Sequence, residues 1–230
     1  VTAMDTQKTM LMVLIALVPS LLVSTYVFGF RVLILTAVCI AASMFFEWAW
    51  NKLMKRKQTV CDLSAALTGT LIAFNLPSGL PYWIAIVGCF VAIIVVKQLF
   101  GGLGQNFMNP ALAGRCFLLI SFAGQMTKFT YDGVTGATPL AVLKNGGEVS
   151  VLKMFLGTTG GVIGETCTIA LLAGGIYLII RKVIAPTIPL IYIGVFSAFI
   201  LVFGGHGFDL EYLAAHLCGG GLMLGAFFMA

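Results

Sequence analysis

Long apolar stretches separated by short polar segments run through the whole chain. A transmembrane helix needs roughly 20 consecutive apolar residues, and seven stretches reach or approach that length. They are Met10–Phe30, Val32–Trp50, Tyr82–Val96, Ala111–Gln125, Val162–Ile180, Ile184–Phe203 and Leu213–Ala230. A shorter eighth covers Leu63–Leu76. The pattern predicts an all-α polytopic membrane protein with about eight transmembrane or half-transmembrane helices.

The short stretch Leu63–Leu76 differs from the others in length and in its ending. A helix of this length covers only about 21 Å, less than the roughly 30 Å of the hydrocarbon core. It ends in the proline-rich sequence Asn75-Leu76-Pro77-Ser78-Gly79-Leu80-Pro81. We expect a half-helix or re-entrant element, which is stable at membrane depth only where protein or a cavity surrounds it. A tilted span followed by a surface turn is the alternative.

Two segments are weakly similar to each other. The sequence of 68–74 is Thr-Gly-Thr-Leu-Ile-Ala-Phe, and that of 221–227 is Gly-Leu-Met-Leu-Gly-Ala-Phe. The likeness indicates an internal repeat, a common basis for sites at the bilayer midplane. Because the last apolar stretch has no polar flank, we also expect that a carboxy-terminal part is missing.

The composition excludes a soluble domain. Hydrophobic residues make up 60% of the chain and charged residues 9%, with a mean hydropathy of +1.07, whereas a soluble domain carries about a quarter charged residues. The first span is too long for a cleavable signal peptide and is expected to remain as an anchor. The six cysteines are scattered without a C-x-x-C pair, which favours buried thiols over metal or cluster ligands.

Positive charge predicts the orientation in the membrane. Lys52, Lys55, Arg56 and Lys57 follow the second span directly, which indicates a cytoplasmic flank and not a nucleic-acid site. Alternation then places the amino terminus, Lys97 and Arg181–Lys182 inside, and the loop from Met126 to Gly160 outside.

That outer loop contains a polar, glycine-containing motif, Asp132-Gly133-Val134-Thr135-Gly136-Ala137-Thr138. No histidine, cysteine or lysine neighbours Thr138 to activate it, so modification is a better interpretation than catalysis. Gly133 and Gly136 allow a turn and the close approach of a bulky partner. The alternative is an ordinary turn in which Asp132 and Thr135 bind local amides.

Other polar residues lie at the membrane edge or within spans. The glycine and amide stretch 97–110 has no preceding strand and no Gly-Lys-Ser/Thr, so it is not a nucleotide fingerprint. Its Asn106 and Asn109, with Arg115, are expected either to line a polar cavity or to form a tight interhelical turn.

Intramembrane carboxylates are functional candidates by default. We expect Glu47 to pair with Lys52 and Asp62 to cap the following helix. This leaves Glu165, a short way into its span, as a candidate for contact with a cation or an electron carrier. His206 and His216 are isolated and do not indicate a haem.

Four stretches together resemble one family. They are Asp62-Leu63-Ser64 with Leu67-Thr68-Gly69; Ala73-Phe74-Asn75-Leu76-Pro77; the stretch from Lys97 to Asn106 with Asn109-Pro110-Ala111; and Asp132 to Thr138. The chain is similar to the family that comprises the D subunit of the Rnf complex, an ion-translocating ferredoxin:NAD⁺ oxidoreductase, and the B subunit of the sodium-translocating NADH:quinone oxidoreductase. The likeness covers essentially the whole chain.

The resemblance implies a covalent flavin. In that family, an extracytoplasmic flavin transferase uses FAD to join FMN by a phosphoester to the final threonine of (Ser/Thr)-Gly-Ala-Thr. By motif, Thr138 is the acceptor here, and Asp132, Thr135, Gly136 and Ala137 form the rest of the flavin loop. Thr135 stands where serine is more usual. A second, non-covalent riboflavin is a further option that the resemblance leaves open.

The implied fold has ten helices in two inverted repeats of five. Residues 1–160 would form the first repeat, with the flavin loop at about 126–160, and 161–230 an incomplete second one. The implied protein is a subunit of an oxidoreductase in a bacterial or archaeal cytoplasmic membrane. Electron flow would drive Na⁺ or H⁺ transport beside other Rnf subunits, one of them also carrying a flavin. Glu165 and Asn75 are candidates for the cation path.

Two rival interpretations remain at this point. A solute transporter or channel also uses broken helices and glycine breaks near the midplane, and it would contain no flavin. A structural scaffold for redox partners would contain no cofactor either.

Overall fold

The computed structural model describes residues 3–131, 134–136, 139–144, 150–156, 161–165, 167–204, 209–219 and 221–229. Almost every described element is a helix. The first half comprises α1 (Ala3–Phe28), α2 (Arg31–Leu53), η1 (Val60–Asp62), α3 (Ser64–Phe74), α4 (Tyr82–Phe90), η2 (Val91–Gln98), α5 (Pro110–Ser121) and α6 (Ala123–Met126). Next come strands β1 (Phe129–Tyr131) and β2 (Val134–Gly136), then α7 (Pro139–Lys144), α8 (Val151–Leu156) and η3 (Ile163–Glu165). The remainder comprises α9 (Thr168–Ile180), α10 (Thr187–Phe203), α11 (Leu210–Cys218), α12 (Leu222–Leu224) and η4 (Gly225–Met229).

The apolar helices of the described residues match the predicted number. Two of them, α1 from Thr6 and α2, are long and apolar enough to cross a membrane. Five shorter apolar helices follow: α3, α4 with η2, α5, α9 and α10. The bent pair of α11 with α12 and η4 is the last. Two, five and one make eight, which agrees with the prediction of about eight transmembrane or half-transmembrane helices.

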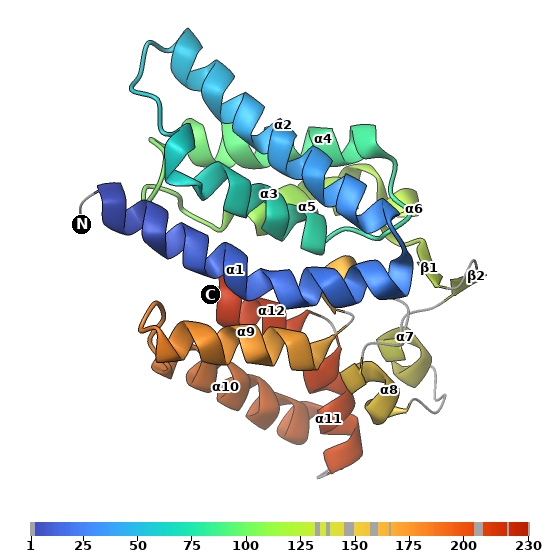
Figure 1. The fold of residues 1–230 in the computed structure, drawn as a ribbon. Coiled ribbons are helices and arrows are strands. Elements are labelled where there is room, and N and C mark those ends of the chain that lie inside the picture. Colours follow the sequence, from blue (N-terminus) through green and yellow to red (C-terminus); the bar gives the residue numbers. More distant parts are fainter. Residues whose placement is uncertain are drawn as a thin grey trace.

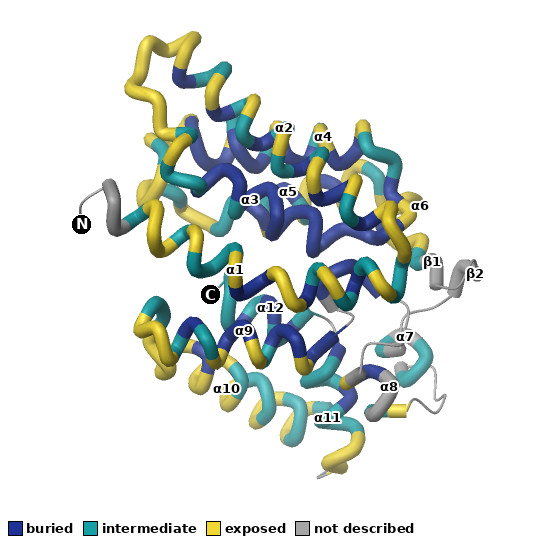
Figure 2. Tube along the Cα trace, in the orientation of Figure 1, coloured by how far each residue is buried: buried dark blue, intermediate teal, exposed yellow. Residues whose placement is uncertain are grey.

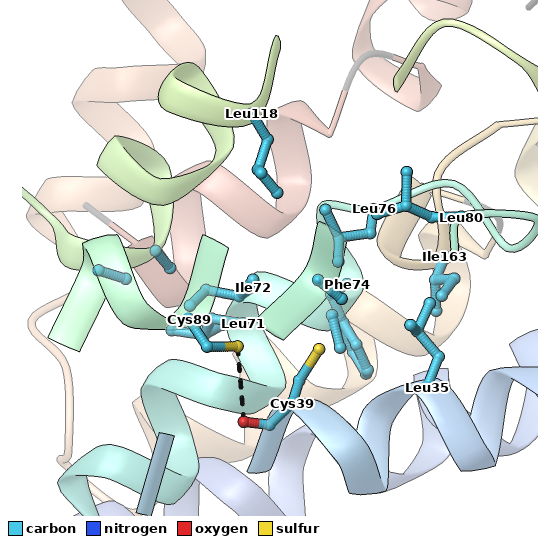
Figure 3. Packing of buried hydrophobic residues seen from close by; sticks show 14 of the residues in the cluster. Leu35, Cys39, Leu71, Ile72, Phe74, Leu76, Leu80, Cys89, Leu118 and Ile163 are labelled. Carbon is cyan, nitrogen blue, oxygen red and sulfur yellow. Dashed lines mark hydrogen bonds between the residues drawn. The ribbon is translucent and has the colours of Figure 1, made fainter. Parts of the chain in front are cut away.

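Helix α1 lies between two groups of helices (Figure 1). On one side are α2, α3, α4 and α5, and on the other are α9, α10, α11 and α12. The buried core joins the two groups, since Leu35 of α2 and Phe74 of α3 (Figure 3) belong to one cluster with Leu171 of α9 and Leu224 of α12. Buried residues concentrate on α3 and the surfaces facing it, as Figure 2 shows.

Helix α10 has an almost wholly exposed apolar surface. Pro189 is the only residue of this helix that is buried, while Leu190, Val195 and Phe203 are each more than half exposed. An exposed face of this kind is unfavourable in water and favourable against lipid tails. The helix therefore fits a bilayer environment.

The predicted span Val162–Ile180 is wrong in its first part. Helix α9 begins at Thr168, and η3 with its Glu165 precedes it. The reason is tight packing: a Cβ on Gly164 would lie 2.8 Å from Leu224 and 2.9 Å from Phe74. The chain is held against these two residues in place of continuing as a helix, so Glu165 lies before the helix and not inside it.

Two other predicted spans are interrupted. The stretch Leu213–Ala230 bends by 63° between α11 and α12, where the sequence is Gly219-Gly220-Gly221 and Gly221 has a φ of +68°. Glycine adopts this left-handed conformation without the cost of a Cβ clash. The stretch Ala111–Gln125 is divided between α5 and α6, because Phe122 (φ −130°, ψ 42°) leaves the helical conformation.

The contact between α2 and α3 depends on Gly69. A Cβ at this position would lie 2.7 Å from the carbonyl oxygen of Cys39 and 2.9 Å from the Cα of Ile40. We expect Gly69→Ala to lower the free energy of unfolding by about 1–3 kcal/mol through overpacking. The measurement is thermal unfolding of the purified protein in detergent.

Gly194 on α10 is the matched control, because nothing lies within 4 Å of a Cβ built there. Gly194→Ala should unfold at the same temperature or slightly higher, since alanine is about 0.5–1 kcal/mol better than glycine within a helix. Equal melting temperatures for the two variants would contradict the proposed close α2–α3 contact.

Candidate functional site

The chain is not helical between α3 and α4, and this segment, residues 75–81, is called the break. The segment around η3 holds the break in place. The backbone amide of Ile163 donates to the carbonyl of Leu76 at 3.2 Å, and Pro77 forms an antiparallel bridge with Val162. The hydroxyl of Ser24 on α1 donates to the carbonyl of Ile163 at 2.7 Å. Where 63–76 was predicted to be a half-helix, the structure has a short helix, since α3 has 11 residues and ends at Phe74.

Arg31 satisfies the other end of the same break. Its guanidinium donates to the carbonyls of Gly79 and Leu80, each at 3.2 Å. The guanidinium thus gives two carbonyls of the non-helical segment 75–81 a charged donor.

Asn75, directly after α3, lies within a polar cluster. Its side-chain amide donates to the carbonyl of Leu71 at 2.7 Å and contacts the sulfur of Met229 at 3.7 Å. Its Oδ1 accepts a hydrogen bond from the guanidinium of Arg115 at 2.9 Å. Asn109 caps α5 through its Oδ1 and donates from Nδ2 to the carbonyl of Met229 at 3.2 Å. The break, the start of α5 and the end of η4 therefore meet.

A buried ion pair forms a second cluster, between α2, η2 and the start of α3. Lys97 Nζ lies 3.1 Å from Glu47 Oε2 and 3.3 Å from Oε1, and both side chains are 1% exposed. Lys97 also donates to the hydroxyl of Ser64 at 2.7 Å. A charge removed from water needs such a partner, because an isolated buried ion is strongly unfavourable.

Two neutral side chains bind the Glu47 carboxylate, and a third supports one of them. Its Oε1 accepts hydrogen bonds from Gln98 at 3.1 Å and from Thr59 at 2.7 Å. Thr59 in turn accepts a hydrogen bond from Asn51 at 3.1 Å. Gln98 follows Lys97 directly at the end of η2, a π-helix. Departures from α-helical geometry of this kind are frequent at functional sites.

The predicted partner of Glu47 is wrong. Lys52 instead lies over the ring of Trp48, 4.8 Å from its centroid, while Lys97, predicted to be a cytoplasmic flanking charge, is the true partner. Asp62 does cap the start of α3: its Oδ1 accepts from the Ser64 amide at 3.0 Å and the Ser64 hydroxyl at 2.8 Å.

The polar motif after α6 lies partly in a hairpin. Strands β1 and β2 are antiparallel, with Thr130 opposite Thr135 and Phe129 opposite Gly136. The backbone of Thr135 and Gly136 is therefore in β2, and Pro139 begins α7. Asp132, Ala137 and Thr138 lie outside the described residues.

The structure brings together some of the predicted site residues. Asn75, Asn109 and Arg115 form one cluster around Met229. The contacts described do not join Asn106 to this group; its Oδ1 is buried without a hydrogen-bond partner among the described residues. Glu165 is placed in η3 by its backbone.

Sequence reasoning missed the pairing of Glu47 with Lys97. The two residues are 50 positions apart, and Lys97 was assigned to a cytoplasmic flank because the alternation of spans places the end of Tyr82–Val96 inside. A usable signal was present: Lys97 directly follows an apolar run, and a lysine inside the membrane implies a buried acid as partner.

The fold and these clusters define a helical multi-pass membrane protein with interrupted helices and buried polar networks. The family described as "NQR2, RnfD, RnfE family" matches residues 1–230. The chain belongs to this family.

Three curated relatives extend the comparison. The chain is 49% identical to the D subunit of the Na(+)-translocating ferredoxin:NAD(+) oxidoreductase complex of Acetobacterium woodii, over 98% of this chain and 72% of the relative. It is 39% identical to the D subunit of the proton-translocating ferredoxin:NAD(+) oxidoreductase complex of Clostridium ljungdahlii, over 97% and 73%. Identity to the D subunit of the ion-translocating oxidoreductase complex of Rhodobacter capsulatus is 32%, over 100% and 75%.

Breaking the buried ion pair should destabilise the fold. We expect Lys97→Met to lower the free energy of unfolding by about 3–5 kcal/mol, because Glu47 would keep a buried charge without a cationic partner. The double variant Lys97→Met/Glu47→Gln should recover part of this loss. The measurement is chemical or thermal unfolding in detergent micelles.

Lys52→Met is the matched control, since Lys52 is exposed and its removal leaves Glu47 paired. It should change stability by no more than about 1 kcal/mol. The assignment fails if Lys52→Met is as damaging as Lys97→Met.

Proposed function

We propose that the protein is the D subunit of an ion-translocating ferredoxin:NAD⁺ oxidoreductase complex, with FMN attached covalently to Thr138. The observation that carries the proposal is the combination of family membership with the sequence Asp132 to Thr138. The relatives named above are subunits of such complexes. The chain would then be part of an electron-transferring translocase in a prokaryotic cytoplasmic membrane.

The described part of the loop fits an attachment site for a bulky group. The β1–β2 hairpin fixes the backbone of Thr135 and Gly136 by pairing with Thr130 and Phe129. It precedes the acceptor position, and Pro139 restricts the backbone directly after it. A threonine hydroxyl is the right chemical group for a phosphoester. When bound, the flavin supplies the electron-transfer chemistry, while the protein holds it in place and tunes it.

Charge supports the proposed orientation. The amino terminus, the α2–α3 loop and the turn between α9 and α10 lie at one end of the molecule, and β1, β2, α7 and α8 lie at the other (Figure 1). The first end carries Lys55–Lys57 and Arg181–Lys182. By the positive-inside rule this end is cytoplasmic. The loop with Thr138 is then extracytoplasmic, accessible to a flavin transferase.

Asn106, Asn109 and Arg115 are candidate contacts for a second, non-covalent flavin. The buried Oδ1 of Asn106, which has no partner among the described residues, can accept a hydrogen bond from a ligand. Arg115 and Asn109 already have partners in the protein. A second flavin, a riboflavin, would find its polar contacts here.

Glu165 and Asn75 are candidates for the cation path. The Oδ1 of Asn75 accepts from the Arg115 guanidinium at 2.9 Å, and that positive charge opposes a second cation at the same oxygen. Glu165 precedes α9 next to the segment that holds the break. The relatives from Acetobacterium woodii and Clostridium ljungdahlii differ in the ion that their names give, Na⁺ in one and H⁺ in the other, so the proposal extends to either ion.

Covalent flavin can be tested by its fluorescence. The protein is co-expressed with a flavin transferase, denatured and separated on a gel, and wild type is compared with Thr138→Val and Thr135→Val. We expect fluorescence in the wild type and in Thr135→Val, and background signal in Thr138→Val, because only Thr138 matches the acceptor position.

Thr135→Val is also the control for folding, since β2 tolerates a β-branched residue. A dark wild type would overturn the flavin proposal if the same transferase labels a known substrate in parallel. The transporter or scaffold interpretation would then be favoured.

The cation path can be tested in the assembled complex. We expect Glu165→Gln to reduce ion transport per electron transferred several-fold while the covalent fluorescence of Thr138 is retained. The measurement is ion uptake into proteoliposomes alongside NAD⁺ reduction. If both rates equal those of the wild type, Glu165 is not part of the path.

A further inference from the structure

Helices α2 and α9 end in the same hydrogen-bonded arrangement. At the end of α2, the amide of Arg56 donates to the carbonyl of Asn51 at 2.8 Å, and the amide of Lys55 donates to that of Lys52 at 3.3 Å. This pair of bonds, spanning five and three residues, is the Schellman motif. Lys55 occupies its left-handed position, with a φ of +53°.

The end of α9 repeats the motif. The amide of Val183 donates to the carbonyl of Leu178, and the amide of Lys182 donates to that of Ile179, each at 2.9 Å. Lys182 has a φ of +56°. A lysine therefore occupies the left-handed position in both motifs.

Glycine is the usual residue at this position, because a Cβ is strained in the left-handed region. Among the described residues, only Lys55, Leu63 and Lys182 combine a side chain with a positive φ. Attraction between the lysine charge and the negative carboxy-terminal end of the helix does not account for the strain. A lysine in the last helical turn has the same attraction without a left-handed backbone. In α2, Lys52 already occupies that last turn. The same residue type, lysine, thus occupies both strained positions.

The loop that follows α2 and the turn that follows α9 lie at the same end of the molecule (Figure 1). Lys55 and Lys182, which belong to these two segments, are exposed. Arg56 and Lys57 follow Lys55, and Arg181 precedes Lys182; all three are exposed. In the part of the chain that the structure describes, no ion pair joins these cations to a carboxylate, and Glu47 pairs with Lys97 instead. The end presents positive charge in need of an anion.

Apolar side chains beside the lysines indicate which anion it is. Leu53 is 76% exposed and Met54 49%, next to Lys55, and Ile180 is 72% exposed, two residues before Lys182. On α2, the exposed Trp48 lies beneath Lys52. Basic side chains adjoining exposed aliphatic and aromatic ones match the boundary between phospholipid head groups and acyl chains. An acidic protein surface would not require the apolar neighbours.

We propose that the two lysine-capped helix ends, Lys55 with Arg56 and Lys57, and Lys182 with Arg181, bind the phosphates of anionic phospholipids. Leu53, Met54 and Ile180 contact the acyl chains below. The contacts with phosphate strengthen with the negative charge of the leaflet.

The test uses the double variant Lys55→Gly/Lys182→Gly in the full chain, within the detergent-solubilised complex. Glycine suits the left-handed positions, so the helix ends should be retained. The probes are phosphatidylglycerol and phosphatidylcholine, and native mass spectrometry measures the lipid bound. We expect the wild type to prefer phosphatidylglycerol and the double variant to bind several-fold less of it. The melting temperature without added lipid should be unchanged or higher.

Two control variants separate charge from backbone. Lys55→Arg/Lys182→Arg keeps the charge and should keep the binding. Lys128→Gln removes an exposed charge after α6, near the β1–β2 hairpin, and should also bind like the wild type. Equal retention of both lipids by the wild type would overturn the proposal, as would full phosphatidylglycerol binding by the glycine variant. Loss of other subunits from the glycine variant with lipid binding intact would assign this end to an acidic protein partner and also overturn it.

Discussion

The hydrogen bond from the amide of Ile163 to the carbonyl of Leu76 joins two interrupted segments that would otherwise be unstable in a bilayer. Lipid offers no hydrogen-bond partner, so irregular backbone at membrane depth must be satisfied by protein. Here each interrupted segment supplies partners to the other, with Ser24 adding a bond from α1. Arg31 satisfies the far end of the first segment. The two groups of helices on either side of α1 are thus held in one arrangement by the breaks themselves.

The lengths of the apolar runs predicted the helices well where a run is uniform. The first two spans and the short α3 followed from hydropathy and from the prolines after Asn75. The interruptions within later runs were missed because hydropathy does not register close packing. Gly164 is as apolar as its neighbours, and its contact with Phe74 and Leu224 exists only in the folded chain. Three adjacent glycines at 219–221 were the one local sign of a break.

The sequence predicted which residues belong to the candidate site, but not which of them contact one another. Residue type and position identified Asn75, Asn109 and Arg115, because amides and a guanidinium at the edges of apolar runs need partners. That Asn75 binds Arg115 could not be inferred, since the two are 40 positions apart. The same limit applies to Glu47: a nearby lysine was available in sequence, but helix geometry directs Lys52 over Trp48 and Lys97 into the core.

The buried charges and the exposed charges have different physical roles. Glu47 and Lys97 neutralise each other within a shell of Ser64, Gln98 and Thr59, so together they add no net charge to the interior. The exposed lysines and arginines at the ends of α2 and α9 remain uncompensated and give one end of the molecule its charge. Orientation by the positive-inside rule depends on this second group alone. Counting Lys97 among the flanking charges was therefore unnecessary: the side proposed for the Thr138 loop is the same without it.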